Sequence, residues 1–162
     1  MRLHRDYSFD AACEDVYALL TDEAFQRERI ADTGVDPTAS VTHDSGGDVV
    51  TITLHLATTG VPSRLKTFVG DQLTVTDERH WGAAEADGAR RGNLSVRVAE
   101  VPVTLRGTVT LVPKGEGCVL SIDGDLRCSI PVVGRVVETQ LVEGLSGVVD
   151  AEADAVAASL ED

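Results

Sequence analysis

Residues 129–160 read SIPVVGRVVETQLVEGLSGVVDAEADAVAASL. After Pro131, which suits the first turn of a helix, apolar residues recur at helical spacing along one stripe. The stripe contains Val133, Val137, Leu141, Leu145, Val148, Val149, Val156 and Leu160. The charged residues lie mostly outside it and are Arg135, Glu138, Glu143, Asp150, Glu152 and Asp154. The pattern predicts one long amphipathic helix, from about Val132 to Leu160, that covers a sheet formed by the preceding chain.

Three glycines interrupt this predicted helix, at positions 134, 144 and 147. A glycine inside a helix costs about 1 kcal/mol relative to alanine, so a structural gain must offset it. The backbone approaches the sheet closely at these points, or the helix kinks, or the missing side chains leave space for a ligand.

The chain before the helix alternates apolar and polar residues with a period of two, which is typical of strands that bury one face. Turn-forming residues separate such segments at 44–48 and 114–117. Together with Leu3–Phe9, the pattern predicts seven antiparallel strands in a curled sheet that is covered on one side. Residues predicted to share a face include Leu3, Arg5, Tyr7 and Phe9; Val50, Ile52, Leu54 and Leu56; Leu73, Val75, Asp77, Arg79 and Trp81; and Val103, Leu105, Val109 and Leu111.

Helical patterns occur at two other places. Between the first two strands, Asp10 is placed to cap a helix over 11–20, and Thr21-Asp22 to cap a second over 23–31. Residues 61–70 break the strand alternation and predict a short helical turn from Pro62 to Gly70. At the mouth of a curled sheet this segment is either a mobile gate that contacts ligand or a fixed plug.

The charge balance restricts the partners. Acidic residues outnumber Lys and Arg by 27 to 14, giving a net charge of −13 without any basic block. Nucleic acid and anionic membrane surfaces both require clustered positive charge, so we expect neither as a partner. No apolar run reaches the length of a membrane span, and the N-terminus lacks a signal-peptide pattern, so we expect no stable membrane insertion and a cytoplasmic location.

The length of 162 residues indicates a single domain over residues 1–162. Cys13, Cys118 and Cys128 are odd in number and lack CxxC spacing, so we expect three reduced residues in the core. The four histidines are scattered, and the motifs GxSxG, HExxH and GxGxxG and the P-loop are absent. We therefore expect no metal and no cofactor, and no catalytic residue is assigned.

Short motifs follow one another along the predicted order of strand, two helices, six strands and long helix. They are residues 7–11, Leu20-Thr21-Asp22 with Phe25, residues 78–82, Pro102-Val103 with Gly107-Thr108 and Leu111, and residues 130–134 with Glu138. In this order the motifs resemble the START-like or Bet v 1-like (SRPBCC) superfamily, and within it a bacterial domain family of unknown function. The resemblance implies an α+β helix-grip fold, with a seven-stranded sheet curled around the C-terminal helix, and an apolar cavity that binds hydrophobic ligands.

The residues leave the function of that cavity open. Asp77 and Arg79 share a face with Trp81, so they form either a polar anchor inside the cavity or a pair at its rim in water. The candidate cavity residues are Tyr7, Leu54, Leu65, Phe68, Asp77, Arg79, Trp81, Leu105, Val137 and Leu141. Three hypotheses follow: a carrier or sensor of a lipid-like or polyketide-like molecule, a cyclase or hydratase that uses Asp77, Arg79 and Tyr7, or a protein-interaction module with a filled interior.

Overall fold

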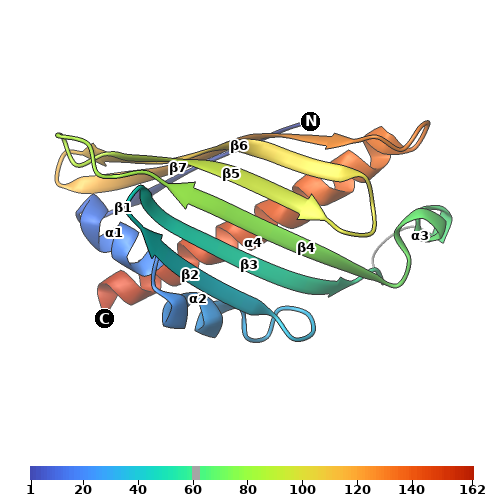
Figure 1. Ribbon diagram of the computed structural model, residues 1–162, viewed down its shortest axis with the longest axis horizontal. Helices are drawn as coiled ribbons and strands as arrows, with labels where there is room; N and C mark the ends of the chain where they lie inside the picture. Colours follow the sequence, from blue (N-terminus) through green and yellow to red (C-terminus); the bar gives the residue numbers. More distant parts are fainter. Residues whose placement is uncertain (60–62) are drawn as a thin grey trace.

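The computed structural model describes residues 1–59 and 63–162, and within α3 the side chains of residues 64, 65 and 68 are outside the description. One seven-stranded sheet and four helices make up this part of the chain (Figure 1). In chain order they are β1 (Arg2–Phe9), α1 (Cys13–Leu20), α2 (Glu23–Ile30), β2 (Thr38–Asp44), β3 (Gly47–Ala57), α3 (Ser63–Val69), β4 (Gln72–Trp81), β5 (Arg90–Val98), β6 (Val103–Lys114), β7 (Gly117–Cys128) and α4 (Gly134–Glu161).

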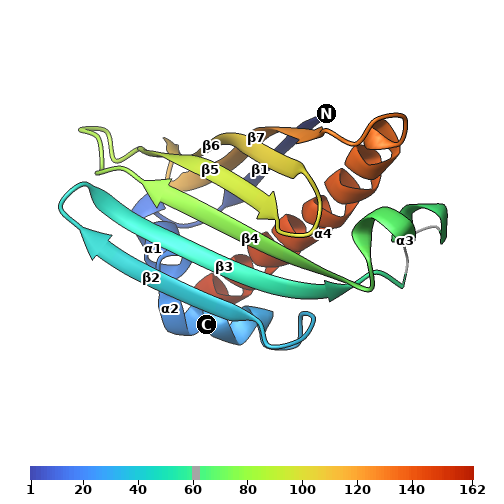
Figure 2. The same cartoon turned by 45° about the vertical axis from the view of Figure 1, so that its right-hand side comes forward.

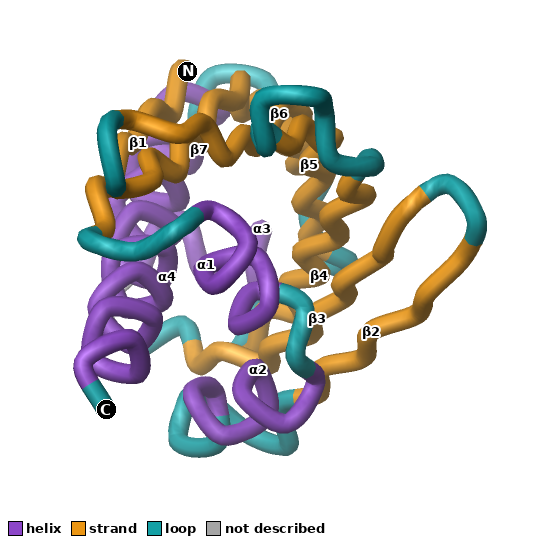
Figure 3. Tube along the Cα trace, turned by 90° about the vertical axis from the view of Figure 1, so that its left-hand side faces the viewer, coloured by secondary structure: helices purple, strands orange, loops and turns teal. Residues whose placement is uncertain are grey.

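The sheet wraps around α4. Its strand order is β1-β7-β6-β5-β4-β3-β2, and every neighbouring pair is antiparallel. Seen end-on, the strands form an arc from β1 to β2, while α4, α1 and α2 close the open side (Figure 3). Seen from the side, α3 lies at the opposite end of the molecule from α1 and α2 (Figure 2). The architecture confirms the predicted α+β helix-grip fold.

Strand register places the predicted faces as expected. In the middle of β4, Asp77 pairs with Ile52 of β3 and with Val96 of β5, and both neighbours are buried. Arg79, two residues on, is 4% exposed. The interpretation that the Asp77–Arg79 pair lies at a water-exposed rim is therefore wrong for Arg79, because the strand keeps its alternation to Trp81.

The helix termini depart from prediction in two places. Asp22 caps α2 as predicted, since its Oδ1 accepts a hydrogen bond of 3.0 Å from the backbone N–H of Phe25. Asp10 does not cap α1, whose N-cap is Ala12 without a side-chain bond. At the start of α4, Val132 has a φ of 71° and is fully exposed, so the helix begins at Gly134 instead of Val132.

The glycines of α4 have two different settings. A Cβ at Gly134 would lie 2.8 Å from the carbonyl oxygen of Cys128, so of the three explanations open for these glycines, close approach to the sheet applies at this one. Gly144 and Gly147 are exposed, and a Cβ on either would meet no described atom within 4 Å. At these two positions glycine is explained neither by close packing nor by space left inside the cavity.

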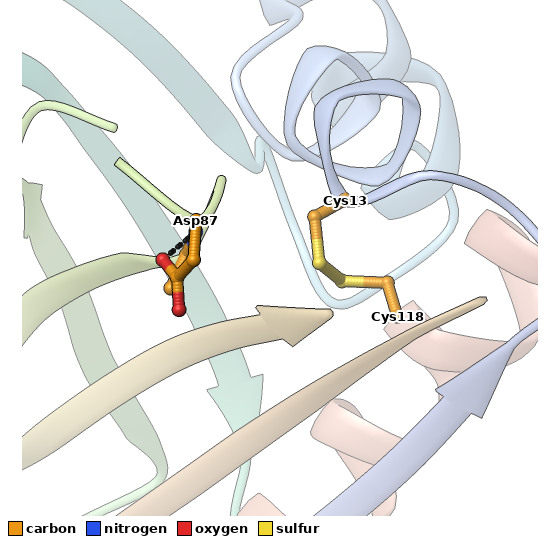
Figure 4. Close-up of a disulfide and its surroundings, with 4 residues drawn as sticks. Cys13, Asp87 and Cys118 are labelled. Atoms are coloured by element: carbon orange, nitrogen blue, oxygen red, sulfur yellow. Dashed lines mark hydrogen bonds between the residues drawn. A yellow bond between two sulfur atoms is a disulfide. The ribbon is translucent and has the colours of Figure 1, made fainter. Parts of the chain in front are cut away.

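A disulfide joins Cys13, at the start of α1, to Cys118, near the start of β7 (Figure 4). The prediction of three reduced cysteines is wrong for these two, while Cys128 is free. Because Phe9 pairs directly with Cys118 in the β1–β7 ladder, the turn after β1 brings residue 13 back over residue 118. The pairing spans 105 residues, and no local spacing in the sequence could have indicated it.

Within the described residues, no helix is long and apolar enough to cross a membrane. The same part of the chain contains no cluster of three or more His, Cys, Asp or Glu residues arranged to hold a metal ion.

Candidate functional site

A cavity of about 30 Å³ lies between the inner face of the sheet, α2 and α4. Among the described residues fifteen line it, and twelve of these are apolar: Leu3, Ile30, Ile52, Leu54, Val75, Leu94, Val96, Leu105, Ile122, Leu145, Val148 and Val149. The other three are Arg29, Asp77 and Arg79. A volume of this size holds roughly one or two water molecules, so the side chains fill most of the interior in this conformation.

Arg79 is the centre of a buried ionic cluster in the cavity wall. Its Nε and Nη2 donate to the two carboxylate oxygens of Asp77 at 3.2 and 3.0 Å. Its Nη1 and Nη2 donate to the two oxygens of Glu152, on α4, at 3.2 and 2.9 Å. Glu152 is 2% exposed, so the bidentate pair with Arg79 joins the sheet to the covering helix away from water.

The cluster extends to α2 through Arg29. Its Nη2 lies 3.4 Å from Oε1 of Glu152, and its Nε donates to Oε1 of Gln26 at 2.6 Å. Gln26, 1% exposed, in turn donates to the carbonyl oxygen of Leu20 at 2.9 Å. Two guanidinium groups and two carboxylates thus link α2, β4 and α4, and their formal charges cancel.

The surroundings of Arg79 and Glu152 favour the ionised forms of both groups. Burial disfavours the charged form of Arg79, but the carboxylates of Asp77 and Glu152 outweigh it and raise its pKa. Burial alone would raise the pKa of Glu152, but Arg79 and Arg29 outweigh it and lower that pKa below its ordinary value of 4.5. The pKa of Arg29 is lowered, first by burial and also by Arg79, and Glu152 offsets only part of this. Arg29 is therefore less well compensated than Arg79 or Glu152.

Some of the predicted cavity residues line the cavity and others do not. Leu54, Asp77, Arg79 and Leu105 line the cavity. Val137 is buried and Leu141 half-buried in α4, and neither is among the lining residues. The side chains of Leu65 and Phe68 lie outside the described residues, so the hypothesis of a gate at 61–70 stays a prediction; the backbone of α3 matches the predicted helical turn.

Tyr7 and Trp81 have partners elsewhere. The Tyr7 hydroxyl donates to Oδ1 of Asp150 at 2.6 Å, and Arg5 contacts the same oxygen at 3.3 Å. Burial and this acceptor raise the pKa of Tyr7. Trp81 packs edge-on against Tyr17 of α1, with ring centroids 5.6 Å apart, and its Nε1 is buried without a partner among the described residues. Neither side chain joins Asp77 and Arg79 at the cavity.

The sequence interpretation missed three residues of this site: Arg29, Gln26 and Glu152. A signal existed for Glu152, because it lies three residues after Val149 and four before Val156, within the apolar stripe. Arg29 directly precedes the buried Ile30 on α2, but its sequence context does not distinguish it from the exposed Arg27.

Comparison with known families gives an independent assignment. Residues 5–160 match the family described as a protein of unknown function, DUF2505. The chain belongs to the DUF2505 family. No protein of curated function matches the sequence of this DUF2505 protein.

Solved structures confirm the fold of the DUF2505 chain. TTHA0849 from Thermus thermophilus is 16% identical, with 98% of this chain and 99% of that one covered and a TM-score of 0.60. The Zhui aromatase/cyclase from a Streptomyces species, R1128, is 14% identical over 99% and 93% of the chains, also with a TM-score of 0.60. Norcoclaurine synthase from Thalictrum flavum, in complex with dopamine and hydroxybenzaldehyde, is 14% identical over 99% and 86%, with a TM-score of 0.55. These neighbours share the helix-grip arrangement of sheet and C-terminal helix with the DUF2505 chain.

Proposed function

We propose that this DUF2505 protein binds a hydrophobic, largely aliphatic small molecule between its sheet and α4. The observation that carries the proposal is the cavity itself, in which an apolar wall surrounds one buried ionic cluster. Apolar linings with a few fixed polar groups are typical of small-molecule sites. Similar folds support it, since one neighbour is an aromatase/cyclase and another was solved with dopamine and hydroxybenzaldehyde. The Leu and Val lining suits lipid-like or polyketide-like aliphatic chains better than flat aromatic molecules.

Binding requires the cavity to grow, because small-molecule pockets commonly reach about 300 Å³ or more. The covering helix α4 provides Leu145, Val148 and Val149 to the lining. Gly144 directly precedes Leu145 and Gly147 directly precedes Val148, and both lie on the exposed face, where neither packs against a described atom. Two glycines weaken the helix at this point, so bending of α4 there is the movement by which the cavity opens.

Replacing both glycines by alanine tests this opening. The variant Gly144→Ala/Gly147→Ala is expected to gain about 2 kcal/mol of stability, about 1 from each position, because neither alanine meets a clash. It is also expected to bind 1-decanol more slowly than the wild type. Chemical denaturation and stopped-flow binding measure the two effects. A stabilised variant with the wild-type association rate would exclude bending at these glycines.

A pair of matched substitutions on α4 tests the proposed site. Leu145 and Leu141 are one turn apart and both half-buried, but only Leu145 lines the cavity. Leu145→Trp is expected to fill the space and weaken 1-decanol binding by at least about tenfold, and Leu141→Trp to leave it within about twofold. Titration calorimetry measures the affinities, and native mass spectrometry of gently purified protein shows whether an apolar compound co-purifies. No binding of 1-decanol by the wild type would contradict the proposed function.

The site has features for and against each of the two alternative functions. A cyclase- or hydratase-type enzyme is favoured by Asp77, which lines the apolar cavity with 21% of its side chain exposed. It is weakened by Tyr7, which binds Asp150 instead of joining the cavity. The interaction-module hypothesis is supported by the small cavity. Against it, the large apolar side chains exposed among the described residues are Val35 and Val132 only, which form no extended patch.

The cytoplasmic location stays a proposal. Persistent disulfides are uncommon in the cytosol because cellular thiols reduce them, so the Cys13–Cys118 bond weighs against it. The oxidation state of these two cysteines in the cell, measured by thiol alkylation, decides whether the bond exists there.

A further inference from the structure

Arg29 is a buried cation whose hydrogen-bonding capacity is largely unused. Its side chain is 8% exposed and lines the cavity. Its Nε donates to Gln26, a neutral amide, and its ion pair with Glu152 is 3.4 Å long, without a hydrogen bond between them. Among the described residues, no hydrogen-bond acceptor contacts its Nη1. A guanidinium carries five N–H donors, so most of those of Arg29 remain available.

The neighbouring carboxylates are already hydrogen-bonded to Arg79. Both oxygens of Glu152 accept hydrogen bonds from Arg79, and both oxygens of Asp77 do the same. Arg79 is therefore the main partner of both carboxylates, and its own positive charge repels Arg29. A buried charge is costly unless it is paired and hydrogen-bonded, so this position favours an additional anion.

We propose that Arg29 binds the carboxylate of the ligand, which makes the ligand class an aliphatic monocarboxylate. The planar guanidinium matches a carboxylate in bidentate geometry. The hydrocarbon chain extends from there along the apolar lining formed by residues such as Leu54, Leu105 and Leu145. This inference rests on the proposed function and names the polar end of its ligand.

Two probes of equal chain length, decanoate and 1-decanol, test the assignment at pH 7. The wild type is expected to bind decanoate at least about tenfold more tightly than 1-decanol, because a charge-assisted bond to a buried donor is stronger than a neutral one. Arg29→Met, which keeps the aliphatic stem, should lose about tenfold in decanoate affinity and keep 1-decanol within about twofold. Arg29→Lys keeps the positive charge but loses the planar bidentate donor group. Its decanoate affinity should lie between those of the wild type and Arg29→Met.

Arg27 provides the control on the same helix. It lies two residues before Arg29, its side chain is 64% exposed, and it pairs with Glu23. Arg27→Met is expected to leave both affinities unchanged. Titration calorimetry measures all variants, and circular dichroism checks that each is folded.

The possible outcomes separate the inference from the proposed function. Equal affinity for the two probes in the wild type would overturn the carboxylate assignment and leave the hydrophobic site intact. Equal loss of affinity for both probes in Arg29→Met would show that Arg29 only holds α2 against α4. That result would also overturn the carboxylate assignment. A wild type that binds neither probe would overturn the proposed function itself.

Discussion

Replacing Cys13 and Cys118 together by alanine is expected to lower the free energy of unfolding by about 4 kcal/mol. The bond closes a loop across a sequence separation of 105 residues, so it removes a large part of the conformational freedom of the unfolded chain. It also fixes the start of α1, which precedes the α2 residues of the ionic cluster. Denaturant unfolding of the oxidised wild type and the double variant measures the difference.

Two controls isolate the covalent bond. Cys128→Ala changes the free cysteine near the end of β7 and should shift stability by about 1 kcal/mol at most. The wild type reduced with dithiothreitol keeps every side chain and should lose nearly as much stability as the double variant. Equal stability of reduced and oxidised wild type would contradict the expectation.

The fold was largely predictable because apolar residues recur with a period of two in the strands and with helical spacing in α4. Alternation placed Asp77 and Arg79 on the same face as Trp81 and left two interpretations open, of which the buried one holds for Arg79. Helical spacing identified α4 and its apolar stripe. Both patterns are local, so each strand or helix shows them independently of its partners.

The ionic cluster was only partly predictable because its pairs form between distant segments. Glu152 was assigned to the polar side of α4 because it is charged, although its spacing from Val149 and Val156 places it on the buried stripe. Its partner Arg79 is 73 residues away, and only the folded sheet brings the two together. The same holds for the disulfide, because the pairing of Phe9 with Cys118 in the β1–β7 ladder brings Cys13 close to Cys118.

The second large effect is expected for Glu152→Gln, which should cost about 3 kcal/mol of stability. The substitution keeps the size of the side chain and removes its charge, so Arg79 and Arg29 remain buried with Asp77 as their remaining carboxylate. An uncompensated buried cation is strongly destabilising, whereas exchange of a whole ion pair for apolar residues often is not. Asp154→Asn, two residues further on α4 and exposed, is the matched control and should change stability by less than about 0.5 kcal/mol.

The pH dependence of the stability difference between the wild type and Glu152→Gln tests whether the charge of Glu152 causes that difference. Burial alone would raise the pKa of Glu152, but Arg79 and Arg29 outweigh it and hold that pKa below 4.5 in the folded protein. A depressed carboxylate pKa contributes stability that is present above the ordinary pKa and is lost as the pH falls through the folded value. The gap between wild type and Glu152→Gln should therefore be full at pH 7 and narrow below about pH 4.5, in denaturant titrations at each pH. A gap of equal size at pH 3 and pH 7 would show that the charge of Glu152 does not cause the difference in stability.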